Sequence, residues 1–337
     1  MSDKSIIEWT DATWNPVTGC TKVSQGCKHC YAERDWARLV HLPAYHGRAF
    51  TDVECHPERL DQPLRWKRPR RIFVNSMSDL FHPDVPDEFI DRVFAVMALA
   101  NQHNFQVLTK RPRRMLDYCK TLGKHNGIDR VSIAAQQISS KTWFLWHKGD
   151  VGWNLPNVHL GVSVEDQLTA DERIPLLLQT PAAVRWISAE PLLGPVSLVV
   201  PFDGAKVDSA VGAKPGIHAL DWVVAGGESG PKARPSHPDW FRSLRDQCRA
   251  AGVPFLFQQW GEWQIASMEN GHHDCDMARN RAHWIHVDGA ITKPSCLRAD
   301  IPTAIISKAY AMIKVGKARA GRHLDGVLHD EYPEAAK

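Results

Sequence analysis

The stretch LDWVVAGGESG, residues 220–230, decides the fold class because it joins a buried strand to a glycine-rich polar end. Its apolar core is continuous and does not alternate with polar residues, which is typical of a strand covered on both faces. Five further runs share this design and end in polar or glycine-rich residues. They begin at Arg70, Asn104, Asn157, Val184 and Val253. The repetition predicts a parallel sheet.

Helix-like segments separate several of these runs. They begin at Pro86, Thr169 and His237, and the third stops at Gly252 before a new strand begins. The order strand, polar end, helix, strand is typical of right-handed crossovers. Six such strands, with an N-terminal one, predict an α/β fold with a partial or full TIM-like barrel. A doubly wound sheet is the competing arrangement.

Three stretches do not fit this rhythm, and they suggest the domain organisation. We expect a barrel over residues 1–262, with insertions around 120–155 and 196–218. Residues 263–337 form a C-terminal extension packed on the barrel. A tryptophan-rich patch at 143–153 belongs to the first insertion and is interpreted as core or interface.

Composition places limits on the class of protein. The 337 residues are 43% hydrophobic, which is enough for a large core. The net charge of +3 is too small to indicate a class of charged partner. The N-terminal residues lack the apolar segment of a signal peptide, and no apolar run is long enough to span a membrane. We therefore expect a cytoplasmic protein with no membrane partner. In that compartment clustered cysteines indicate metal or redox chemistry.

The stretch NPVTGCTKVSQGCKHCY, residues 15–31, places Cys20, Cys27 and Cys30 in a C-x6-C-x2-C spacing. A structural zinc ion takes four ligands. His29 lies between two of the cysteines and would struggle to reach the same ion, but Cys55 and His56 keep zinc open as an interpretation. The alternative is a [4Fe–4S] cluster held by three thiolates, which leaves one iron free for a small molecule.

Several motifs together carry a family resemblance. They are IEWTDATWNPVTGC (7–20), GCKHCYAER (26–34), SMSDLFH (76–82), LTKRP (108–112), SAEPLLG (188–194), GGESG (226–230), QWGEW (259–263) and GKARAGRHLDG (316–326). As a set they resemble a phage-associated, poorly characterised family of radical S-adenosylmethionine (SAM)-like proteins. The usual cysteine spacing of radical SAM enzymes is C-x3-C-x2-C, so the first gap is longer here. His29 stands where those enzymes have a ring before the last cysteine.

The resemblance implies a (β/α)6 partial barrel of the radical SAM type and a [4Fe–4S] cluster on the three cysteines. It further implies that the open iron chelates SAM, and that reduction by flavodoxin or ferredoxin yields a 5′-deoxyadenosyl radical. Residues expected to hold the cofactor are His29, Ser76, Asp79, Ser163, Glu165, Gly226 and Gly227. Ser76 and Asp79 are assigned by position, because the glycine pair that related enzymes have there is missing.

Four carboxylates follow predicted strands, namely Asp79, Glu165, Glu190 and Glu228. The carboxyl ends of parallel strands in a barrel meet at one mouth, so we expect these side chains to converge. Lys110 follows another strand and can neutralise one of them. Glu190, Glu228 and Lys110 are the candidate catalytic residues.

The substrate is the least determined feature. Basic runs stand at Arg65–Arg71, Lys110–Arg114 and Lys314–His323, and such runs can neutralise phosphates. We expect a nucleic acid or nucleotide, with a peptide or a small metabolite as alternatives. A zinc-stabilised nucleic-acid-binding protein without catalysis is the interpretation from a different class. Six further residues could suggest a second metal site, but their spacing matches no zinc template: His272, His273, Cys275, His283, His286 and Cys296.

Overall fold

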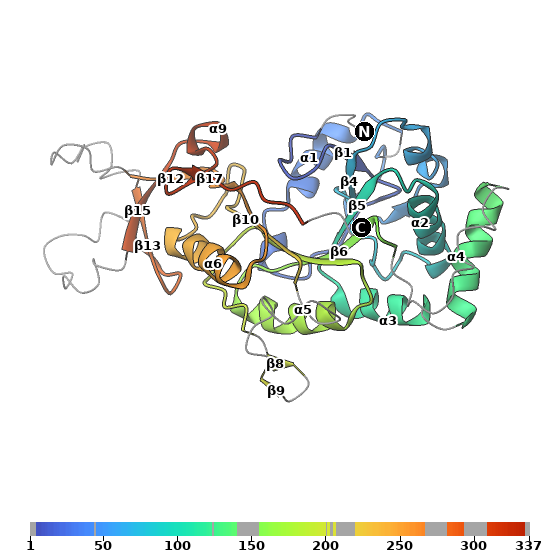
Figure 1. Cartoon of the computed structure of the whole chain (residues 1–337). Coiled ribbons are helices and arrows are strands. Elements are labelled where there is room, and N and C mark those ends of the chain that lie inside the picture. Colours follow the sequence, from blue (N-terminus) through green and yellow to red (C-terminus); the bar gives the residue numbers. More distant parts are fainter. Residues whose placement is uncertain are drawn as a thin grey trace, which may run out of the picture.

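A computed structural model of the chain describes residues 5–43, 45–122, 125–139, 155–199, 201–202, 205–206, 220–266, 282–292 and 309–333 (Figure 1). Its central element is a seven-stranded sheet in the order β1-β4-β5-β6-β7-β10-β11. Every neighbouring pair in this sheet is parallel. The order in the sheet follows the order along the chain, whereas a doubly wound sheet reverses direction at a switch point. The sheet curls into a half-barrel, as Figure 1 shows.

The predicted strands are all confirmed. They are β1 (Ala12–Trp14), β4 (Arg71–Val74), β5 (Asn104–Thr109), β6 (Val158–Ser163), β7 (Val184–Ala189), β10 (Trp222–Gly226) and β11 (Phe255–Gln259). Most of their side chains are buried, which explains why the sequence shows continuous apolar runs in place of alternation.

Helices cover the outer face of the sheet. They are α2 (Asp87–Leu99), α3 (Pro112–Leu122), α4 (His125–Ile138), α5 (Gln167–Gln179) and α6 (Pro238–Ala251). Alternation along each strand separates two cores: in β4, Ile72 and Val74 join the helix-side core, and Phe73 joins a separate inner cluster. Part of the expected insertion at 120–155 is helical, because α4 lies within it. Arg130 of α4 pairs with Asp91 of α2 at 3.2 Å.

Aromatic side chains fill the inner face of the half-barrel. The ring of Trp9 lies 4.8 Å from that of Phe73 and 5.2 Å from that of Trp186, and Trp186 lies 5.2 Å from Trp222. Val224 and Leu256 complete this inner cluster. As in closed barrels, the interior is packed with side chains and forms no open pore.

The two ends of the chain cover the gap between the edge strands β1 and β11. The Phe257 N–H of β11 donates to the carbonyl of His329 at 3.0 Å. The Trp222 indole donates to the carbonyl of Glu331 at 2.9 Å, and the Tyr332 hydroxyl donates to the carbonyl of Glu8 at 3.1 Å. The C-terminal segment thus joins the N-terminal segment across the open side of the sheet.

A smaller antiparallel sheet follows the half-barrel, in the order β12-β15-β13-β14. Its strands are β12 (Trp263–Ile265), β13 (Ala282–His286), β14 (Ile291–Thr292) and β15 (Ala309–Lys314). It begins at Trp263, where the sequence predicts the extension. The tryptophan-rich patch at 143–153 lies outside the described residues, as do His272, His273, Cys275 and Cys296.

Shorter elements connect these parts: β2 (Val17–Thr18), β3 (Glu54–Cys55), α1 (Tyr31–Leu39), a β8–β9 hairpin (Pro201–Phe202 and Ala205–Lys206), α9 (Lys317–Ala320), β16 (His323–Leu324) and β17 (Val327–Leu328). Within the part of the chain that the structure describes, no helix has the length and apolar character that crossing a membrane requires.

The inner aromatic cluster leads to a stability prediction at Gly161 of β6. A Cβ atom there would lie 2.5 Å from the indole of Trp186, too close for an unstrained contact. Gly161→Ala should lower the free energy of unfolding by about 1–3 kcal/mol, because overpacking outweighs the ~0.4–1 kcal/mol gained from a stiffer unfolded chain. Urea unfolding measures this. In a Trp186→Leu background Gly161→Ala should lower the free energy of unfolding by less. An equal loss in both backgrounds would contradict overlap with the Trp186 indole as the cause.

Candidate functional site

A cavity of about 830 Å³ lies at the carboxyl ends of the parallel strands. Its lining includes the predicted residues Cys20, Cys27, His29, Cys30, Ser76, Asp79, Lys110, Ser163, Glu190, Gly227 and Glu228. Glu165 and Gly226 are the two predicted site residues that do not line it. Residues that are far apart in the sequence therefore converge, as expected for the mouth of a barrel.

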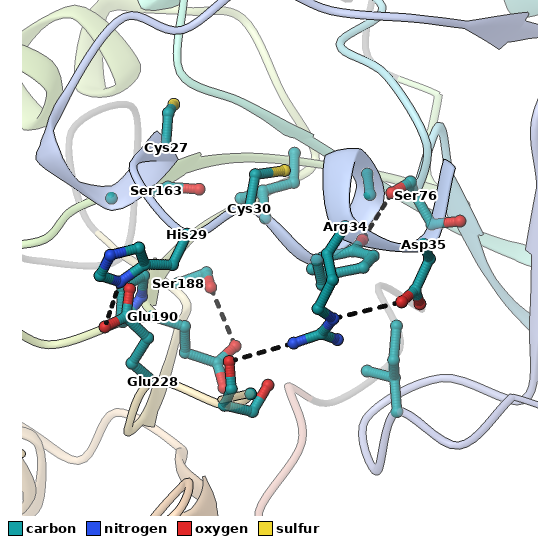
Figure 2. A pocket seen from close by; sticks show the side chains of 18 of the residues that line it. Cys27, His29, Cys30, Arg34, Asp35, Ser76, Ser163, Ser188, Glu190 and Glu228 are labelled. Carbon is teal, nitrogen blue, oxygen red and sulfur yellow. Dashed lines mark hydrogen bonds and ion pairs between the residues drawn. The ribbon is translucent and has the colours of Figure 1, made fainter. Parts of the chain in front are cut away.

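The segment of residues 20–30, which we call the cysteine loop, runs along this mouth between β2 and α1. Its three cysteines are free and partly exposed, and Figure 2 shows two of them, Cys27 and Cys30. Burial and the nearby Asp79 carboxylate raise the pKa of Cys20 to about 11, and burial raises the pKa of Cys30. Without a metal both are protonated thiols at neutral pH, so metal binding would have to displace protons.

Asp79 fixes the start of the cysteine loop through Arg111. The buried Asp79 carboxylate accepts from the Thr109 hydroxyl at 2.7 Å and from Arg111 Nη1 at 2.9 Å. Arg111 also donates to the Thr21 carbonyl at 3.0 Å, and its Nη1 lies 3.7 Å from Cys20 Sγ. One guanidinium thus joins two strand ends to the first cysteine.

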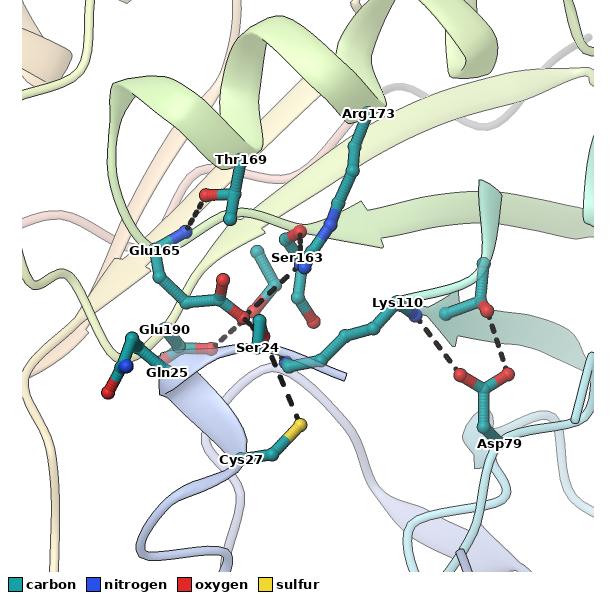
Figure 3. Close-up of polar contacts among 12 residues, drawn as sticks. Ser24, Gln25, Cys27, Asp79, Lys110, Ser163, Glu165, Thr169, Arg173 and Glu190 are labelled. Atoms are coloured by element: carbon teal, nitrogen blue, oxygen red, sulfur yellow. Dashed lines mark hydrogen bonds and ion pairs between the residues drawn. The ribbon is translucent and has the colours of Figure 1, made fainter. Parts of the chain in front are cut away.

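Glu165 supports the middle of the loop (Figure 3). Its side chain is fully buried, and Oε1 accepts from Ser24 at 2.9 Å and from Arg173 at 3.2 Å; Lys110 Nζ lies 3.4 Å away. A Cβ atom on Gly26 would lie 2.5 Å from the same oxygen, so the glycine permits this close approach. Glu165 contacts the loop and does not face the cavity.

Glu228 fixes the end of the loop. It accepts from Arg234 Nε at 2.8 Å and from His29 Nδ1 at 3.3 Å, and Arg234 also donates to the Gln25 carbonyl at 3.1 Å. Burial alone would raise the pKa of Glu228, but the hydrogen bonds from Arg234 and His29 lower it. Since a carboxylate only accepts, His29 donates from Nδ1 to this group.

Glu190 differs from the other three carboxylates. It lines the cavity, accepts from the Ser188 hydroxyl at 3.0 Å and forms no ion pair with the described residues. Burial raises its pKa to about 7. Gly226 leaves room for it, because a Cβ atom there would overlap the Glu190 carboxylate, and Gly227 leaves room for the Trp260 carbonyl in the same way.

The three basic runs lie in different parts of the structure, and the second reaches the mouth of the half-barrel as expected. Arg71 starts β4, at the opposite end from the cavity, and pairs there with Asp11 at 2.8 Å. Lys110 and Arg111 do lie at the mouth, but Glu165 and Asp79 neutralise them. In the third run, Lys317 lines the cavity.

Sequence reasoning missed the groups that hold the loop. Arg173 is on α5, Arg234 follows a glycine-rich turn and Ser24 is in the loop itself. No local pattern marks them, because each acts on a carboxylate or loop residue that only the fold brings near. The tetrad SDLF and the run LTKRP did contain Asp79 and Arg111, but the spacing between them gave no sign of their contact.

A single-ion site does not emerge from the residues described. Among them, no three His, Cys, Asp or Glu side chains are grouped to hold one metal ion. His56, one candidate for a fourth zinc ligand, is buried and hydrogen-bonded to Thr18 at 2.8 Å. Cys55 pairs with Val17 in the β2–β3 ladder. Neither Cys55 nor His56 lines the cavity.

Fold and site together define an α/β protein with a half-barrel whose mouth carries a cavity lined by three cysteines. The sequence profile of one family, described as proteins of unknown function (DUF5131), matches residues 4–333. The chain belongs to this family. Searches among curated proteins and among solved structures found no significant match.

The buried ion pairs of Glu165 lead to a second prediction. Glu165→Gln keeps the size of the side chain but leaves Arg173 and Lys110 without a counter-charge. Breaking such a buried pair should lower the free energy of unfolding by about 3–5 kcal/mol, measured with urea. Glu172→Gln on the exposed side of α5 is the matched control and should change stability by less than about 0.5 kcal/mol. Equal effects would refute a supporting role for Glu165.

The pKa of Glu190 leads to a prediction of pH dependence. Its folded-state pKa of about 7 lies above the ordinary value of 4.5, so the fold disfavours the charged form. Relative to Glu190→Gln, the natural protein should therefore lose stability as pH rises from about 4.5 to 7, and the difference should level off above that. Urea unfolding of both proteins from pH 5 to pH 8 measures it. A difference independent of pH would place Glu190 in an ordinary solvated environment.

Proposed function

We propose that this protein is a radical SAM enzyme in which Cys20, Cys27 and Cys30 hold a [4Fe–4S] cluster, and that it acts on a nucleotide or nucleic acid. One observation carries the proposal. Three unpaired cysteines of a single loop line one cavity at the carboxyl ends of half-barrel strands. That position is where barrel enzymes have their active sites. The motif resemblance supports the same class.

The donor set fits such a cluster better than a single zinc ion. Thiolates are the usual ligands of iron–sulfur clusters, and three of them leave one iron open for a small molecule. A cube of four irons carries its ligands on separate corners, so its thiolates lie farther apart than those around one ion. The three cysteines belong to one loop and line one cavity, so they could serve a single cofactor bound there.

The chain's own residues would position the cofactors and exclude water. With SAM bound, a cluster held by the three cysteines would supply one-electron, radical chemistry at the mouth of the half-barrel. Arg111, Glu165 and Glu228 hold the cysteine loop in place. Asn75 lines the cavity next to Ser76 and its Nδ2 is buried with no hydrogen-bond partner, so it would be a donor for a polar group of a bound cofactor such as SAM.

Ser163 adds a polar group at the end of β6, and the aromatic inner cluster beneath the cavity keeps the site dry. Glu228 and Lys110 are engaged in ion pairs, so in this proposal they position the loop. Glu190 remains free for a substrate. The electron would come from an external donor such as flavodoxin or ferredoxin.

Metal content tests the proposal. Protein purified without oxygen and reconstituted should be brown and contain about four irons with matching sulfide per chain. Cys20→Ala, Cys27→Ala and Cys30→Ala should each abolish the colour, because each removes a ligand. Cys55→Ala, a partly buried cysteine outside the cavity, is the matched control and should keep it. Colourless protein with one zinc would favour the non-catalytic nucleic-acid-binding alternative.

A further inference from the structure

The four strand-end carboxylates fall into two groups. Asp79, Glu165 and Glu228 each have an arginine or lysine nitrogen within 3.4 Å, and each holds the cysteine loop. Glu190 has neither feature: it accepts from Ser188 and its side chain lines the cavity. Figure 2 shows Glu190 and Ser188 at the cavity. Of the four, Glu190 is the carboxylate available to a ligand.

Two buried polar side chains line the same cavity as this carboxylate. Gln258, 7% exposed, lines the cavity from β11, and its Oε1 has no hydrogen-bond partner. Trp9, 2% exposed, has an indole N–H close enough to Glu190 to favour its charged form. A buried polar group without a partner costs about 1–3 kcal/mol. Groups kept at that cost in a cavity point to a ligand that satisfies them.

No side chain of the intervening strand separates Glu190 from Gln258. Glu190 follows β7, Gln258 is on β11, and β10 lies between these strands. At this level β10 carries Gly226, which has no side chain to separate them. The two side chains thus present a carboxylate and an amide along one wall of the cavity.

Apolar side chains lie beside this wall. Ile7, Trp9, Phe73 and Leu108 line the same cavity. An apolar surface next to an amide and a carboxylate suits a planar heterocycle that carries both donors and acceptors on one edge. Glutamine pairs with the edge of adenine and a carboxylate accepts from the amino group of cytosine, so nucleobases have this chemistry. Enzymes that act on single bases read them in such pockets.

We infer that the wall formed by Glu190 and Gln258 is a substrate subsite that binds the base of a nucleotide. The inference rests on the proposed function for the chemistry done there, and it names the substrate class. SAM also carries an adenine, so the base could come from either molecule. The cavity of about 830 Å³ is near the upper end of the ~300–1,000 Å³ found for single-ligand pockets, which leaves room for a substrate beside SAM.

The test measures binding of adenosine, guanosine, cytidine and uridine, and separately of SAM, to the cluster-loaded protein by calorimetry. At least one nucleoside should bind. Gln258→Leu and Glu190→Gln should each weaken the affinity for that nucleoside about tenfold or more. This is the effect of losing a base-edge contact of about 1–3 kcal/mol. SAM affinity should change less than about threefold. Gln264→Leu and Glu172→Gln, both exposed, are matched controls and should change neither affinity.

Each of the other possible results contradicts either the inference or the proposed function. If the wall variants weaken SAM as much as the nucleoside, the wall serves the adenine of SAM and the inference is overturned. If no nucleoside binds the loaded protein, the substrate class is wrong. If the protein binds neither cluster nor SAM but the variants still lose a nucleoside, the proposed function fails and the base subsite stands. Should Gln258→Leu not fold, the isosteric Gln258→Glu takes its place.

Discussion

Burial of charge at the carboxyl ends of the strands is the constraint on which the site depends. Asp79, Glu165 and Glu228 are removed from water, and each is neutralised by an arginine or a lysine that the fold brings to it. Desolvating a carboxylate is costly, and a buried pair offsets that cost only when its geometry and additional hydrogen bonds are good. The cysteine loop supplies some of those hydrogen bonds, through Ser24 and His29. The loop and the ion pairs therefore depend on each other.

This dependence explains why a loop rich in polar residues can hold a defined shape. The segment from Cys20 to Cys30 has little secondary structure besides a short 3₁₀ turn, Gln25–Cys27. Its order comes from contacts with three strand ends and from the close approach of Gly26 to Glu165. Since β-strands in a packed half-barrel are rigid, the positions of the three cysteines are set by the sheet. A cofactor held there would meet ligands placed in advance.

The same arrangement separates support from recognition. Charges that are already paired hold the loop, whereas Glu190, Gln258 and Asn75 keep hydrogen-bonding capacity directed at the cavity. Beneath them the tryptophan cluster closes the interior, and the C-terminal segment seals the open edge of the sheet next to β11. Polar groups with free hydrogen-bonding capacity thus line the end of the half-barrel where a ligand can enter.

The sequence by itself determined the strands, because a strand buried on both faces must be continuously apolar, and runs such as VVAG and FLF meet that condition. It also placed the cysteines and strand-end carboxylates at one mouth, since parallel strands share a carboxyl edge. Only the tertiary structure decided which of the carboxylates form ion pairs that hold the cysteine loop. Each ion pair joins a carboxylate to an arginine from a different part of the chain, namely Arg111, Arg173 or Arg234. Gly226 leaves room for the Glu190 side chain. Such pairings depend on side-chain directions and distances between segments, which one-dimensional spacing does not contain.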